Sequence, residues 1–228
     1  MRALIVKDLR LLAPYAWLIL GGHALFSANG AISPELLFWI NVAMAAFYTV
    51  GLAIIDWRFE ADRFVASLPI GRSTAVWARY VGGLGAAALG TGLYLAWGAL
   101  YGSILPARLG WREGTATWSS PEGIAVFFLT ATALVLLFLP FMYRFGLGRG
   151  VWGFVLAAAI GAAVAIPVLT DIAEPGTRAP SQMLGDVLRS VETDLGPALA
   201  WTTVFGAMAA LVWLSARLSI RGYQRRDL

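Results

Sequence analysis

Six long stretches without a charged residue constrain this chain more than any other feature of its sequence. Each runs for 20 to 28 residues without Asp, Glu, Lys or Arg, and together they are 11–34, 36–55, 80–107, 123–143, 150–170 and 195–216. A helix that crosses the hydrocarbon core of a bilayer needs about 20 apolar residues. The strands of a membrane β-barrel are instead alternating segments of about 10 residues. The windows therefore predict an all-α membrane protein with six transmembrane helices.

The composition agrees with a chain that lies mostly in lipid. Only 13% of the 228 residues are charged, and the mean hydropathy is +0.73. A soluble domain carries roughly a quarter charged residues. We expect one transmembrane domain over residues 1–228, with spans at about 14–33, 36–55, 76–104, 123–143, 151–170 and 197–216. The first span is too long for a cleavable signal peptide, and five more follow it.

The distribution of Lys and Arg predicts the orientation. With a cytoplasmic N-terminus, 13 of the 17 basic residues fall in inner segments. The other four, which are Arg108, Arg112, Arg178 and Arg189, fall in outer segments. Cytoplasmic segments carry an excess of Lys and Arg, so we predict that both termini are cytoplasmic. The short basic segment 144–149, RFGLGR, is then an inner loop between the fourth and fifth spans.

Several kinds of chemistry are excluded by residues that the chain lacks. It has no cysteine and a single histidine, His23, which rules out a thiolate site or a histidine metal cluster. It has no phosphate-binding G-x-x-x-x-G-K-[ST] motif and no nucleophile or metalloprotease motif on a span. We therefore predict no catalytic residue, no metal site and no bound cofactor in this chain. The spans also lack the carboxylates that ion-coupled carriers use.

Polar side chains within the charge-free windows are few, and a polar residue in a span is a functional candidate. The candidates for a translocation path are His23, Asn29 and Asn41. For His23, a role as a hydrogen-bond partner between helices is the alternative.

Two amphipathic segments outside the spans are predicted to lie on the membrane surfaces. Residues 2–12 form either a short helix in the inner interface or a basic topology anchor. In the outer segment 171–196, Leu184, Val187, Leu188 and Val191 recur at helical spacing. We expect a surface helix there that caps the bundle, with a part in an outer gate as the alternative.

The charged stretch 59–72, FEADRFVASLPIGR, separates the second and third windows. Ala61, Phe64, Val65 and Leu68 follow the helical repeat, and Pro69 disfavours helix at the residue before it. These features predict a short amphipathic helix at the cytoplasmic surface. The pattern alone leaves two interpretations open, an interfacial loop helix and an element that binds a partner.

Four features of the chain form a recognisable combination: the N-terminal LIVKDLRLL, the run ASLPIGRSTAVWARY after the second span, the six-span topology and the basic tail. In these features the chain resembles the permease subunits of ABC-2 type ABC transporters. The loop motif has Gly71 where those permeases usually have a small polar residue. The chain is also similar to the small permeases that export amphipathic peptides such as phenol-soluble modulins.

The resemblance implies a mechanism and a set of partners. Two permeases, either two copies or two related chains, pair in a bacterial cytoplasmic membrane. Each docks a separate ATPase subunit, which binds ATP and Mg²⁺, through a coupling helix between spans two and three. Phe64 and Leu68 would seat in a groove of the ATPase. The charges would orient the contact, and the coupling segment as a whole comprises Glu60, Asp62, Arg63, Phe64, Ser67, Leu68, Pro69 and Arg72.

The same resemblance implies an amphipathic peptide or another apolar, lipid-like molecule as cargo, and no nucleic-acid partner. The alternative function is a membrane scaffold or immunity protein that transports nothing. A lipid-modifying enzyme is a third hypothesis, but it requires a catalytic cluster at one membrane face, which the sequence does not contain.

Overall fold

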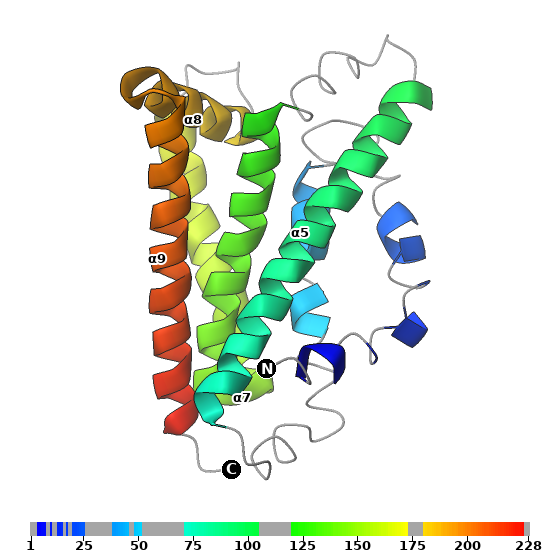
Figure 1. Ribbon diagram of the computed structural model, residues 1–228, viewed down its shortest axis with the longest axis vertical. Coiled ribbons are helices and arrows are strands. Elements are labelled where there is room, and N and C mark those ends of the chain that lie inside the picture. Colours follow the sequence, from blue (N-terminus) through cyan, green and yellow to red (C-terminus); the bar gives the residue numbers. More distant parts are fainter. Residues whose placement is uncertain are drawn as a thin grey trace.

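The protein is described from a computed structural model. The described residues are 4–7, 10, 13–15, 17, 20–25, 38–45, 48–51, 71–104, 120–172 and 180–225. The long elements are the helices α5 (Arg72–Ile104), α7 (Pro121–Ile172), α8 (Pro180–Leu195) and α9 (Pro197–Gln224), and Ala13–Tyr15 forms a 3-10 turn (Figure 1). All regular structure within the described residues is helical, so the predicted all-α class is confirmed for them.

Three helices are long and apolar enough to cross a membrane, within the described part of the chain. They cover Arg72–Leu100, Pro121–Gly146 and Pro197–Gln224. These segments coincide with the third, fourth and sixth predicted spans. Helical pieces at 20–25, 38–45 and 48–51 fall within the first two predicted spans. Six spans and the cytoplasmic position of the termini stay predictions.

Helix α7 is two helices joined at a sharp turn. Gly146 has a φ of 76° and a ψ of 172°, and the chain reverses direction there (Figure 1). A positive φ is readily adopted only by glycine. The predicted inner loop 144–149 is therefore reduced to a turn at one residue. After the turn, a Cβ on Gly150 would lie 2.8 Å from the Cα of Met142, so the absence of a side chain lets the two halves meet.

The two ends of the bundle differ in charge. At one end α5 begins, α7 turns and α9 ends, and we call this the basic end (Figure 1). Its exposed arginines include Arg72, Arg144, Arg149, Arg217, Arg221 and Arg225. Helix α8 lies at the opposite end and carries Asp186, Glu192 and Asp194. By the positive-inside rule, the basic end is predicted to face the cytoplasm.

An aromatic cluster holds the half of the bundle nearer α8. Phe38 contacts Tyr94 of α5 and Phe127 of α7 edge to face, at ring-centroid distances of 5.9 and 5.6 Å. Tyr94 and Phe127 stack at 4.5 Å. Leu188 of α8 packs against this cluster, whereas Val187 is 60% exposed. The predicted surface helix is thus present, but only part of its predicted apolar stripe faces the bundle.

Glycines in α5 set how closely its neighbours approach. A Cβ on Gly90 would lie 2.5 Å from the Cβ of Ala45, and one on Gly83 would lie 2.6 Å from Cγ1 of Val135. Close contact of this kind is a main source of helix association in lipid, where the tails are as apolar as the side chains. The glycine-rich third window therefore packs closely against two neighbours, the 38–45 segment at Gly90 and α7 at Gly83.

We predict that Gly90→Ala destabilises the protein, although alanine is the better helix former by about 1 kcal/mol. The new methyl group must push α5 away from the 38–45 segment, which we expect to cost about 1–3 kcal/mol of unfolding free energy. The measurement is unfolding in mixed micelles of mild detergent and SDS, followed by circular dichroism.

Gly92→Ala is the matched control, because no atom lies within 4 Å of a Cβ at Gly92. It should leave the unfolding free energy unchanged or raise it. Equal destabilisation by the two substitutions would show that the close contact at Gly90 contributes nothing.

Candidate functional site: the basic end of the bundle

The predicted coupling segment is only partly covered by the structure. Among its residues, Glu60, Asp62, Arg63, Phe64, Ser67, Leu68 and Pro69 lie outside the described residues, as does Asn29 of the predicted path. Arg72, His23 and Asn41 are described. Within the coupling segment, the structure therefore describes the point at which the segment joins the bundle.

Arg72 opens α5 and reaches the end of α9. Its Nη1 donates hydrogen bonds to the backbone carbonyl oxygens of Tyr223 and Gln224, at 3.2 and 3.3 Å. Its guanidinium lies 5.5 Å from the centroid of the Tyr223 ring. The last carbonyls of a helix have no partner within the helix and carry the negative end of its dipole, so a cation is favourable there. The start of α5 is thereby attached to the end of α9.

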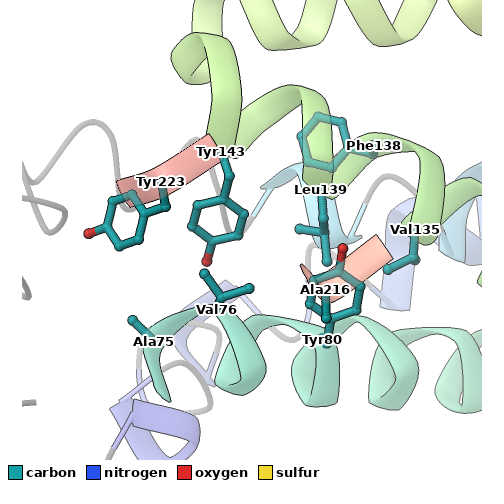
Figure 2. Close-up of a cluster of buried hydrophobic side chains, with 9 residues drawn as sticks. All are labelled: Ala75, Val76, Tyr80, Val135, Phe138, Leu139, Tyr143, Ala216 and Tyr223. Atoms are coloured by element: carbon teal, nitrogen blue, oxygen red, sulfur yellow. The ribbon is translucent and has the colours of Figure 1, made fainter. Parts of the chain in front are cut away.

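A cluster of buried side chains lies directly behind this contact (Figure 2). It comprises Ala75, Val76 and Tyr80 of α5, Val135, Phe138, Leu139 and Tyr143 of α7, and Ala216 and Tyr223 of α9. The rings of Tyr143 and Tyr223 lie 5.2 Å apart. Leu4, in the helical N-terminal piece 4–7, packs against the same cluster. We call this group the basic-end cluster; it joins three membrane-length helices.

Hydroxyl groups connect the three helices within this cluster. The Tyr80 hydroxyl lies 2.6 Å from the Ser215 Oγ and 2.8 Å from the Ser219 Oγ, and all three residues are buried. Ser215 Oγ donates to the Leu136 carbonyl oxygen at 2.7 Å. Since that bond uses the Ser215 proton, Tyr80 donates to Ser215 and accepts from Ser219. We call this chain of hydrogen bonds the tyrosine junction.

The tyrosine junction was not predicted from the sequence, although the sequence contains a signal for it. Ser215, Ala216, Ser219 and Gly222 are small residues spaced along one face of the last span. A small-xxx-small pattern predicts a face on which another helix packs closely. At Gly222 an added Cβ would lie 3.2 Å from the Cα of Arg144, which shows how near α9 comes to α7. The tyrosine on α5 could not be assigned to this face without the structure.

The two described candidates for the translocation path are completely buried. His23 and Asn41 both have 0% exposure. The His23 ring lies 6.1 Å from that of Tyr48, and Asn41 precedes Val42 of the aromatic cluster. A shared path through His23 and Asn41 stays a prediction. Across the described residues, no group of His, Asp or Glu side chains is arranged to hold a metal ion.

These features define a class of protein before any comparison. Close contacts at glycines and a few hydroxyl hydrogen bonds hold the membrane-length helices together. Three of these helices meet in the basic-end cluster. Such an arrangement is typical of a polytopic membrane protein. A family model described as ABC-2 family transporter protein matches residues 3–224, nearly the whole chain. The chain therefore belongs to the ABC-2 transporter permeases, which are multi-pass membrane components of transporters and are not themselves catalytic. No match was found among curated proteins or among solved structures.

We predict that Tyr80→Phe weakens the packing of α9 against α5 and α7. Ser219 loses its partner, and hydrogen bonds between membrane helices contribute about 0.6 kcal/mol on average and up to about 1.7. A double-mutant cycle of Tyr80→Phe with Ser219→Ala measures the coupling in the mixed-micelle unfolding assay. A coupling energy close to zero would contradict the assignment.

Tyr48→Phe provides the control for this experiment. The Tyr48 hydroxyl is buried and has no hydrogen-bond partner among the described residues. Removing it should therefore be neutral or stabilising. A loss of unfolding free energy as large as that of Tyr80→Phe would mean that removing any buried tyrosine hydroxyl destabilises the protein to the same extent.

Proposed function

We propose that this chain is the membrane-spanning permease of an ATP-driven ABC exporter. It works as a dimer, with a second copy or a related permease, in a bacterial cytoplasmic membrane. ATP and Mg²⁺ are bound by a separate ATPase subunit that docks at the basic end. Membership of the ABC-2 family supports the permease role.

The contact of Arg72 with the last carbonyls of α9 is the observation that carries the coupling part of this proposal. Any displacement of the coupling segment enters α5 at this residue. Helix α5 is 33 residues long, and its first turns belong to the basic-end cluster. Because that cluster also contains residues of α7 and α9, movement of the segment is transmitted to three spans together.

Two different tasks follow for the residues of the coupling segment. Phe64 and Leu68 provide the apolar anchor that enters a groove of the ATPase, while Glu60, Asp62 and Arg63 orient the contact by charge. The predicted helix should end at Leu68, because Pro69 disfavours helix at the residue before it. Arg72 attaches the segment to the bundle, so it transmits movement rather than binding the ATPase.

The cargo we propose is an amphipathic peptide or a lipid-like molecule. The charge-free windows place no ionised group at membrane depth, where a charged side chain is costly. A path between such helices suits a molecule that already partitions into lipid. His23, Asn29 and Asn41 would provide the few hydrogen bonds that the polar face of the cargo needs.

We predict that the tagged protein, solubilised from its native membrane, retains an ATPase of the ABC class in stoichiometric amount. Phe64→Asp should reduce the bound ATPase at least tenfold, because an ionised carboxylate cannot enter an apolar groove at an interface centre. The measurement is affinity capture with quantitative mass spectrometry.

Val187→Asp is the control substitution. Val187 is 60% exposed on α8, at the end of the bundle opposite the basic end, so ATPase capture should be unchanged. Intact, monodisperse protein that captures no ATPase, before or after crosslinking, would favour the scaffold or immunity protein instead.

We also predict that Arg72→Ala impairs transport without releasing the ATPase. The ATPase should remain bound, while transport of a labelled amphipathic peptide into vesicles falls roughly fivefold, since a charge-assisted hydrogen bond at an exposed site contributes about 1 kcal/mol. Arg72→Lys should restore part of the activity, because it keeps the charge but has a different donor geometry. Loss of the ATPase itself from Arg72→Ala would assign Arg72 to docking.

A further inference from the structure

An apolar groove runs along the outside of the bundle between the first half of α7 and α9. Its volume is about 390 Å³. It is lined by Ala133, Leu136, Leu137, Pro140, Phe141, Leu211, Leu214, Ser215 and Leu218. Leu137, Leu211, Leu214 and Leu218 are exposed, so the groove opens away from the bundle. Its volume lies within the range of about 300–1,000 Å³ that small-molecule sites occupy.

Both walls of the groove lead to an arginine at the basic end. On α7 the lining residues end at Phe141, and Arg144 follows on the same face. On α9 they end at Leu218, and Arg221 follows in the same way. From Ala133 to Arg144 the helix rises about 16 Å, which is close to half of the roughly 30 Å hydrocarbon core. The groove and the arginine beyond it therefore span about the thickness of one hydrocarbon leaflet.

The close contact at Gly222 brings the backbones that carry the two arginines near one another. A Cβ on Gly222 would lie 3.2 Å from the Cα and 3.3 Å from the Cβ of Arg144, and Arg221 is the neighbour of Gly222. Both arginines are exposed. Helix α9 contains no acidic residue, and the acids of α7 are Glu122 and Asp171, near the two ends of that helix and far from Arg144 along the chain. Two like charges at one site favour an anionic ligand.

We propose that the groove binds an acyl chain of an anionic phospholipid, with the lipid phosphate between Arg144 and Arg221. The leaflet is the cytoplasmic one, and this assignment rests on the orientation in the proposed function. The combination of an apolar groove with two arginines at its mouth does not depend on that orientation. Arginine pairs phosphate oxygens bidentately and suits such a site.

A second copy of the chain fits this surface less well. A two-fold dimer through the groove would place the arginines of both copies near one another, and no acid of α9 could offset their repulsion. A lipid instead brings the negative charge and the apolar chain in one molecule. Ser215, at the floor of the groove, belongs to the tyrosine junction, so an occupied groove supports the contact of α7 with α9.

Native mass spectrometry of the purified chain tests the site, with dioleoyl phosphatidylglycerol and dioleoyl phosphatidylcholine as probes. We expect phosphatidylglycerol to bind at least tenfold more tightly than phosphatidylcholine. The double variant Arg144→Gln/Arg221→Gln should lose this preference. Ala133→Phe, which fills the groove and leaves the arginines intact, should weaken phosphatidylglycerol binding to a similar extent.

Two further variants keep the test decisive. Arg149→Gln/Arg225→Gln removes the same charge from the same end and should keep affinity within about twofold. Arg144→Lys/Arg221→Lys keeps the charge and should retain most of the binding, which controls for folding.

The proposal is overturned if both lipids bind equally, or if the control pair loses as much affinity as Arg144→Gln/Arg221→Gln. It is also overturned if glycerophosphoglycerol, which has no acyl chains, binds as tightly as the lipid, since the site would then be one for free phosphate. Dissociation of a dimer by Ala133→Phe without a change in lipid binding would assign the groove to a second copy. No ATPase is present in this experiment, so its outcome is independent of whether the coupling proposal holds.

Discussion

Close approach of helices in a medium without water is the constraint on which the rest of this structure depends. In lipid, apolar side chains gain little from contacting one another rather than the tails, so packing and a few hydrogen bonds must hold the spans. Gly83 and Gly90 let α5 contact Val135 and Ala45, and Gly222 does the same for α9 and α7. Each glycine sits where a single methyl group would displace a neighbouring helix. The arrangement of the basic end follows from these contacts.

The polar contacts between the helices lie close to the places where glycines allow the helices to approach one another. The tyrosine junction lies within the basic-end cluster and uses one hydroxyl of α5, two of α9 and a carbonyl of α7. Arg72 adds a contact at the exposed end of the bundle, where the last carbonyls of α9 have no partner within the helix. A charge is tolerable at an exposed position, whereas the buried contacts are made by neutral hydroxyls. The burial of each group therefore determines its chemistry.

The sequence predicted the described spans well and the contacts between them poorly, for physical reasons. A charge-free window of 20 or more residues has few alternatives to a spanning helix, so α5, α7 and α9 were expected. The hydrogen bonds of Tyr80 are made to residues 135 and 139 positions away, and no local pattern specifies such a partner. Arg72 was expected to act through its charge, but its partners are backbone carbonyls, which any sequence possesses. A loop over residues 144–149 was predicted where the structure has a turn at Gly146, because composition does not show how tightly the chain can turn at a glycine.

Helix α9 connects the separate features of the basic end. Its last carbonyls receive Arg72, its serines complete the tyrosine junction, and its outer face forms one wall of the groove. Its apolar outer face is largely exposed, so α9 is held to the rest of the bundle mainly on one side. A helix held on one side can respond to a force applied at its end or to a molecule bound along its other face. Coupling from the cytoplasmic surface and occupation of the groove would then act on the same helix, because both change how α9 lies against α7.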